Sequence, residues 1–144
     1  MAEHLRHRFF VASGLLALLM SACTHLMNGP GAVTLPDGQV AIVYVGGVHC
    51  SIWNVMSESD GKATSLVGQP KHADRFRLTP GRYVIVYECM HGTPNHSQTI
   101  QRGEAVDLKP GHVYQVRSSR NPFTHKPTAW IEDHQTGEVV AGKK

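Results

Sequence analysis

The feature that most constrains the fold is a series of short apolar runs, rich in Val, Ile and Tyr, separated by turn-forming residues. Val40–Val45 and Cys50–Met56 are the first two, and an Asp60-Gly61 step separates the second from Ala63–Val67. Runs of this length and composition are typical of β-strands, and Asp-Gly favours a tight hairpin. After residue 22 no helical periodicity extends over three turns. The chain is therefore expected to be all-β.

Two segments 30 residues apart echo each other: Leu78-Thr79-Pro80-Gly81-Arg82-Tyr83 and Leu108-Lys109-Pro110-Gly111-His112-Val113-Tyr114. Pro presets the first central φ of a type II turn, and Gly accepts the positive φ at the second. Each echo is thus predicted to be a type II turn joining a hairpin. The paired runs are Asp74–Leu78 with Tyr83–Cys89, and Ala105–Leu108 with Val113–Ser118.

The remaining runs complete the expected sheet. The predicted loops are Met90–His96 and Arg117–Lys126, the predicted strands are Ser97–Ile100, Thr128–Glu132 and Glu138–Ala141, and Asp133–Gly137 is a turn. Eight or so short strands at this spacing predict a small antiparallel β-sandwich over residues 39–144. Trp53 and Trp130 are expected to fill its core.

A different pattern precedes the strands. Arg6 and Arg8 are followed by the apolar run Phe9–Cys23, which ends in small residues. This layout of charged head, apolar stretch and small cleavage site predicts an export signal over residues 1–22. The apolar run is shorter than the roughly 20 residues that a membrane-spanning helix needs.

Met20-Ser21-Ala22-Cys23 resembles the lipobox of bacterial lipoproteins, with Met in place of the favoured Leu. The resemblance implies that Cys23 receives a diacylglycerol and becomes the first mature residue. It also implies a lipid-anchored protein of the bacterial cell envelope. Because Thr24, not Asp, follows the cysteine, the outer membrane is favoured, with the domain facing the periplasm. Residues 23–38 are expected to be a flexible tether, since their Gly-Pro and Pro-Asp-Gly steps disfavour regular structure.

The cysteine count agrees with export. If Cys23 carries the lipid, Cys50 and Cys89 remain as an even pair in an oxidising compartment, where they are expected to form a disulfide. A metal site is the alternative, because histidines flank both cysteines, and free thiols are the third possibility. The candidate ligands of Cu⁺ or Zn²⁺ are His49, Cys50, Cys89, Met90, His91 and His96.

Neither catalysis nor nucleic-acid binding is indicated. The chain has no nucleophile elbow, no zinc-protease motif and no Gly-rich phosphate loop. The carboxylate pairs Glu58/Asp60 and Glu132/Asp133 are expected in turns. Removing residues 1–22 leaves 12 basic and 10 acidic residues, interspersed, with a net charge of +2. This balance argues against a nucleic-acid footprint, which needs clustered Lys and Arg.

The turns and the last hairpin carry a second resemblance. Small transthyretin-like or PEGA-like sandwich domains of bacterial envelope lipoproteins show a similar pattern over Arg75–Val140; the matching residues are Leu78, Pro80, Gly81, Tyr83, Pro110, Gly111, Tyr114, Trp130, Asp133, Thr136, Gly137 and Val139. The resemblance implies a transthyretin/immunoglobulin-like fold and an envelope location. It implies no catalytic residue and no cofactor. The expected function is a non-catalytic binding or assembly module with an envelope protein as partner; a metal-binding lipoprotein and a small enzyme inhibitor are the alternatives.

Overall fold

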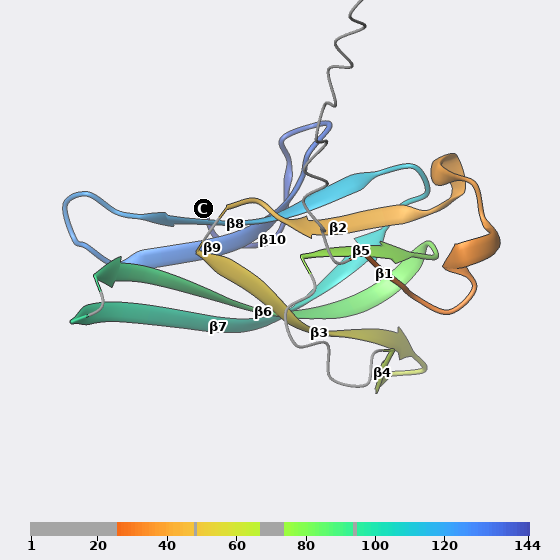
Figure 1. The fold of residues 1–144 in the computed structure, drawn as a ribbon, viewed down its shortest axis with the longest axis horizontal. Coiled ribbons are helices and arrows are strands. Elements are labelled where there is room, and N and C mark those ends of the chain that lie inside the picture. The colour runs from red at the N-terminus through yellow and green to blue at the C-terminus, as the bar shows by residue number, and fades with distance from the viewer. Residues whose placement is uncertain (1–25, 48, 67–73, 94) are drawn as a thin grey trace, which may run out of the picture.

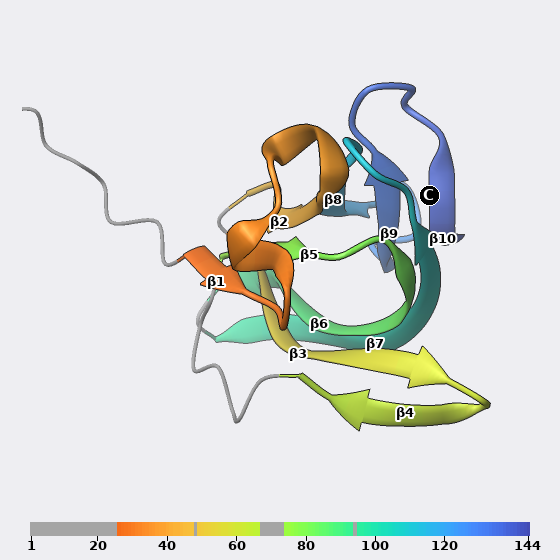
Figure 2. The same ribbon diagram turned by 90° about the vertical axis from the view of Figure 1, so that its right-hand side faces the viewer.

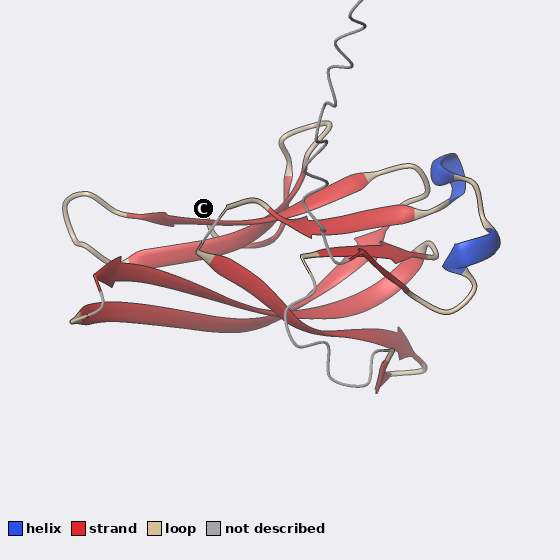
Figure 3. Cartoon of the chain, in the orientation of Figure 1, coloured by secondary structure: helices blue, strands red, loops and turns tan. Residues whose placement is uncertain are grey.

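The computed structural model describes residues 26–47, 49–66, 74–93 and 95–144, and within them the regular secondary structure is strand apart from two short 3-10 helices (Figure 3). The elements are β1 Leu26–Asn28, η1 Ala32–Thr34, η2 Asp37–Gln39, β2 Ala41–Val45, β3 Cys50–Ser59, β4 Lys62–Ser65, β5 Arg75–Leu78, β6 Gly81–Thr93, β7 His96–Leu108, β8 Val113–Arg120, β9 Pro127–Asp133 and β10 Val139–Gly142. The all-β prediction is confirmed. The predicted signal segment and Cys23 lie outside the described residues.

The strands form two sheets that lie one above the other (Figure 1). Sheet A has the order β1-β5-β2-β8-β9-β10, and sheet B has the order β4-β3-β6-β7. Sheet B is antiparallel throughout, but β1–β5 and β2–β8 in sheet A are parallel pairs. The predicted two-sheet architecture is therefore correct, whereas the prediction of a purely antiparallel sandwich is wrong for sheet A.

The core lies between the two sheets and follows the period-2 alternation of the strands. Its fully buried side chains include Val43, Phe76, Leu78, Tyr114, Val116 and Ile131 from sheet A, and Ile52, Val55, Ile85, Tyr87, Cys89 and Val106 from sheet B. Burying one such apolar side chain contributes about 1.5–3 kcal/mol. An exposed ion pair, such as that between Arg82 and Asp107, is screened by water and contributes little by comparison. Apolar packing thus holds the sheets together.

Both Pro-Gly segments carry the chain from one sheet to the other. β5 lies in sheet A and β6 in sheet B, while β7 lies in sheet B and β8 in sheet A. The two predicted hairpins are therefore wrong, because each pair of flanking strands belongs to different layers. The second turn does have the predicted type II character: Gly111 has a φ of 74°, and the His112 N–H donates to the Lys109 carbonyl at 3.3 Å. Gly81, with a φ of 152°, instead begins β6 and does not fit a type II turn.

The connection between β6 and β7 is much shorter than predicted. Both strands have 13 residues, and they pair without a register shift from Gly81↔Leu108 to Thr93↔His96. The predicted loop Met90–His96 is wrong because polar residues are tolerated in this half of the hairpin, which is largely exposed to solvent. The two long hairpins β6–β7 and β8–β9 extend toward the same end of the molecule, at the left in Figure 1.

The segment predicted as a flexible tether is structured over residues 26–38. β1 pairs in parallel with β5 (Figure 2), and Ala32 in the following 3-10 turn is completely buried. Arg77 fastens this segment: its guanidinium donates to the carbonyls of Ala32 and Leu35 and pairs with Asp37 at 2.9 Å. The folded domain therefore begins only three residues after Cys23. No helix among the described residues is long and apolar enough to span a membrane.

Candidate functional site

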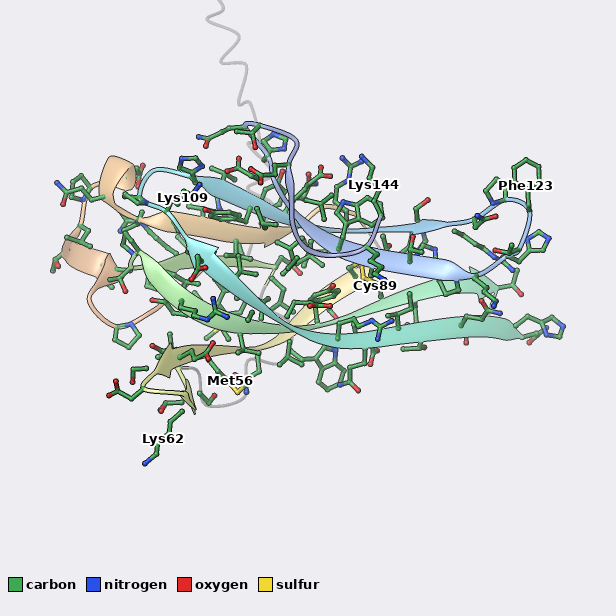
Figure 4. All side chains as sticks on the ribbon, turned by 180° about the vertical axis from the view of Figure 1, so that it is seen from behind. Met56, Lys62, Cys89, Lys109, Phe123 and Lys144 are labelled. Carbon is green, nitrogen blue, oxygen red and sulfur yellow. A yellow bond between two sulfur atoms is a disulfide. The ribbon has the colours of Figure 1, made fainter. Side chains whose placement is uncertain are left out.

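A disulfide joins the two cysteines that the sequence predicts to pair. Cys50 is the first residue of β3 and lies directly opposite Cys89 of β6, with 4.0 Å between the Cα atoms. The bond lies between the two sheets (Figure 4), and Cys89 is completely buried. From sheet A, the Ser118 hydroxyl lies 3.3 Å from the Cys50 sulfur and supplies the proton of that contact. The disulfide thus ties β3 to β6 under the cover of β8.

Two histidines lie beside this disulfide. His49 directly precedes Cys50, and its ring centroid lies 5.6 Å from that of His91. His91 lies on the same face of β6 as Cys89, because side chains two residues apart point the same way. Strand alternation would place His49 on the opposite face from Cys50, but β3 begins at Cys50, so His49 is free of that rule. The structure thus brings the two imidazoles together, each within two residues of a cysteine of the disulfide.

The other two candidate ligands lie elsewhere. Met90 is half exposed on the opposite face of β6, and His96 begins β7 at the far end of the hairpin. With the sulfurs bonded to each other, the described residues contain no group of three or more His, Cys, Asp or Glu side chains that could hold a metal ion. This end of the sandwich is therefore a disulfide with a histidine near each of its cysteines.

Two buried polar atoms on the inner face of β6 have no hydrogen-bond partner among the described residues: the Tyr87 hydroxyl and His91 Nε2. Burial, with a smaller contribution from Glu104 and against the opposing effect of Arg102, raises the pKa of Tyr87 to about 12. Burial lowers the pKa of His91, and the neighbouring His49 and Arg120 lower it further. Both side chains are consequently held neutral near pH 7.

A buried carboxylate lies on the outer face of sheet A. Glu132 is 5% exposed; the Trp130 indole N–H donates to it at 2.9 Å and Arg117 at 2.8 Å. The hydrogen bond from Trp130 is the largest cause of a lowered Glu132 pKa, followed by that from Arg117. Trp130 is buried, but the prediction that it fills the core between the sheets is wrong, because it lies on the face of β9 opposite Ile131, which points into that core. Each oxygen of the Glu132 carboxylate thus accepts one hydrogen bond, which holds Arg117 and Trp130 against the outer face of the sheet.

Asp133 follows on the other face of β9. Its carboxylate accepts a bond of 2.5 Å from His112 and bonds from the backbone N–H groups of Gln135 and Thr136. Burial by itself raises the pKa of Asp133, but these hydrogen bonds outweigh it and leave the pKa below its ordinary value. Asp133 therefore joins the Pro110-Gly111 turn to the β9–β10 turn. The prediction that the Glu132/Asp133 pair lies in a turn is wrong, since both end a buried strand.

The outer face of sheet B carries a row of apolar side chains across three strands. Met56, Val84 and Ala105 are directly opposite one another in the ladder; Met56 points away from sheet A in Figure 4. The next row is Asn54, Val86 and Gly103. Because Gly103 has no side chain, its place between Val84 and Val86 is open: a Cβ there would lie 3.7 Å from each.

Trp53 widens this apolar face. The β3–β6 register shifts between Ile52 and Asn54, so Ile52 and Val55 both point inward while Trp53 is left outside, 49% exposed. The prediction that Trp53 fills the core is wrong, because the alternation used for it assumed a strand without a bulge. No described strand covers this face of sheet B.

β7 is an edge of sheet B, and the direction of its free backbone groups can be derived. The Met90 N–H donates to the His49 carbonyl, which lies on the β3 side of β6. The backbone groups of Cys89 therefore point to β7 and pair with Ile100. It follows that the N–H and C=O groups of Thr99 and Gln101 point away from β6, toward the open edge.

Two grooves lie on the outer face of sheet A. One, of about 340 Å³, is lined by Tyr44, Val45, Asp74, Arg75 and Val113, and the other, of about 420 Å³, by Leu26, Asn28, Val33, Asp37, Ile42, Arg75 and Arg77. Both are open, and their charged residues nearly balance. They contain no nucleophile beside a base, so they do not indicate catalysis.

Sequence reasoning identified the two cysteines but not the β7 edge. A signal for the edge was present, because His96–Leu108 contains neither Pro nor Lys, two residues with which proteins protect exposed edges. Comparison of the chain with known protein families, with proteins of established function and with solved structures found no match. The functional conclusion therefore depends on the chain's own residues.

Proposed function

We propose that the protein is a lipid-anchored, non-catalytic binding module of the bacterial cell envelope, with a sandwich of the transthyretin-like kind. Its binding surface is the open edge of β7, and its partner is an extended segment of another envelope protein. The free edge carries this proposal: within the described part of the chain, the 13 residues of β7 pair on one side only, without a bulge, Pro or Lys. An edge of this kind accepts a further strand through backbone hydrogen bonds.

The side chains next to the β7 edge form an apolar face that a partner strand could contact. Gly103 leaves a gap beside Val84 and Val86, and Trp53 and Met56 extend the same apolar face. A strand added to β7 directs alternate side chains over this face, where apolar residues are favoured. The backbone thus supplies affinity, and the apolar face selects the alternate side chains of the partner.

Two observations support the location. The disulfide between Cys50 and Cys89 is typical of an oxidising compartment. The resemblance of Met20–Cys23 to a lipobox supplies the anchor, and the first strand begins at Leu26, so a lipid on Cys23 keeps the domain close to the membrane. Three residues span at most about 11 Å when fully extended.

The anchor is tested by Cys23→Ala in the full chain. The variant is expected to lose the mass of the acyl groups and to leave the membrane fraction. A variant that still fractionates with membranes would show that Cys23 does not carry the anchor.

The edge is tested by a photo-crosslinking amino acid at Thr99, with the same probe at Val33 as a control on the other sheet. We expect a discrete adduct from position 99 only. Gln101→Pro in the same chain should abolish it, because proline removes an outward N–H without breaking the β6–β7 ladder. An adduct of twice the chain's mass would identify the partner as a second copy of this chain and not as another protein. No adduct, or one unaffected by Gln101→Pro, would overturn the edge as the binding surface.

A further inference from the structure

The cluster beside the disulfide has more ligand atoms than its structural role requires. Its members are Cys50, Cys89, His49 and His91, contributed by the start of β3 and the inner face of β6. A disulfide alone needs neither histidine, yet the two rings lie side by side, and His91 Nε2 is buried without a partner among the described residues. A buried polar atom without a partner is unfavourable, so its retention calls for an explanation.

We propose that reduction of the Cys50–Cys89 disulfide converts this cluster into a tetrahedral Zn²⁺ site with two thiolate and two imidazole ligands. Two sulfurs and two nitrogens are a ligand set that zinc prefers in closed, structural sites. The proposal is independent of the membrane anchor and of the β7 edge.

The chemistry balances with a dithiol as the reductant. The dithiol gives two electrons and two protons to the disulfide and becomes a disulfide itself, leaving Cys50 and Cys89 as thiols. Zn²⁺ then displaces one proton from each thiol. The resulting site has no net charge, because two thiolates balance the metal ion, and it therefore tolerates the neighbouring Arg120.

For the two sulfurs, the site requires only rotation of side chains. Zn–S bonds of about 2.3 Å at a tetrahedral angle place two sulfurs about 3.8 Å apart. Cys50 and Cys89 are direct neighbours across the ladder with Cα atoms 4.0 Å apart, so rotation of the two side chains can provide this separation. The Ser118 hydroxyl, already 3.3 Å from the Cys50 sulfur, can donate a hydrogen bond to the thiolate.

The oxidised protein is expected to bind metal poorly. Its sulfurs are bonded to each other, and the two histidines alone leave half of a tetrahedral shell to water. The redox state of one bond would therefore decide whether the site exists.

The test uses Co²⁺ as a spectroscopic substitute for Zn²⁺, in the full chain with Cys23→Ser so that only two thiols are present. After reduction with a phosphine, we expect one Co²⁺ per chain, with the visible absorption of a tetrahedral ion and a sulfur-to-cobalt charge-transfer band. Added Zn²⁺ should displace it. Without reduction neither band should appear.

Two double variants separate the ligands. Cys50→Ser/Cys89→Ser should abolish the charge-transfer band. His49→Gln/His91→Gln should weaken binding by about tenfold or more, since even outer-shell partners of a ligand are worth 10–100-fold. The remote pair His125→Gln/His134→Gln is the matched control and should leave affinity unchanged.

If reduction unfolds the chain, its cysteines bind metal without a preformed site. Near-ultraviolet circular dichroism of the reduced chain with and without Co²⁺ addresses this point. A native-like signal with metal, lost in the His49→Gln/His91→Gln variant, supports the site. Binding that is equally tight in that variant, binding without reduction, or no stoichiometric binding would each overturn the proposal.

Discussion

The Tyr83 hydroxyl donates a hydrogen bond to the carbonyl of Thr79, 2.9 Å away, on the other side of the Pro80-Gly81 step. Tyr114 does the equivalent after the second Pro-Gly step, where its hydroxyl accepts the Lys109 N–H at 2.9 Å. Both tyrosines are buried and follow a crossover between the sheets. The repeated sequence pattern therefore corresponds to a repeated interaction: after each connection between the sheets, a tyrosine hydroxyl forms a hydrogen bond with the backbone of the connecting segment.

Tyr83→Phe removes this bond and keeps the ring. We expect the free energy of unfolding to fall by about 1 kcal/mol, the net value of one hydrogen bond, because the Thr79 carbonyl loses its donor. Urea denaturation at neutral pH measures the change. Tyr44→Phe is the control, since the Tyr44 hydroxyl has only a 3.4 Å contact with His134 near the surface. Equal losses in the two variants would contradict the fastening role.

Glycine is required in both crossovers, for conformational reasons. Gly81 and Gly111 have φ values of 152° and 74°, and a Cβ on Gly111 would lie 3.2 Å from the Gly38 carbonyl oxygen. We expect Gly81→Ala and Gly111→Ala each to lower stability by about 1–3 kcal/mol, the usual cost of a strained backbone. Thermal unfolding checks this against Gly38→Ala, whose added Cβ meets no atom within 4 Å. A change at Gly38 as large as the other two would refute the argument.

The strand-forming residues were predictable from sequence, and their assignment to sheets was not. Alternation in Tyr83–Cys89 correctly places Tyr83, Ile85, Tyr87 and Cys89 on one buried face. Leu78 and Tyr83 are close in sequence, which favours a hairpin. Placing β5 and β6 in different sheets instead buries both side chains between the sheets, which stabilises the fold more. Competition between a local turn and the core is decided by tertiary packing, which a single sequence does not display.

The site was half predictable for a similar reason. Counting cysteines gives the pair Cys50 and Cys89, and their register confirms it. The approach of His49 to His91 could not be predicted, because it depends on where β3 begins and on β6 continuing through a polar stretch. Likewise, the exposed Trp53 results from a one-residue bulge that leaves no mark in the hydrophobic pattern.

Loss of the disulfide should weaken the fold. The bond closes a loop with a sequence separation of 39, which corresponds to about 4 kcal/mol in the loop-entropy model. Cys50→Ser/Cys89→Ser is therefore expected to melt well below the parent in the absence of metal. A reducing agent should lower the melting temperature of the parent and not that of the double variant. Alkylation of both cysteines in the native, unreduced protein would show that the bond is absent.

Ionisation of Tyr87 is expected to make the free energy of unfolding depend on pH in the alkaline range. Its folded-state pKa is about 12, raised mainly by burial, whereas an unfolded tyrosine has a pKa of about 10. Below pH 10 the phenol is neutral in both states and this contribution is fully present. As the pH rises from about 10 to 12 the unfolded state loses its proton first, so folding becomes less favourable. The parent should therefore lose stability in this window.

Tyr87→Phe removes both the ionisation and a buried hydroxyl that has no partner among the described residues. We expect the variant to be at least as stable as the parent at pH 8, and its advantage to grow between about pH 10 and 12. Urea denaturation of both proteins at pH 8, 10 and 11 gives the difference directly, because the other tyrosines and lysines titrate alike in the two chains. A difference that stays constant with pH would mean that Tyr87 ionises in the folded state as it does in the unfolded one, and hence that its hydroxyl reaches solvent.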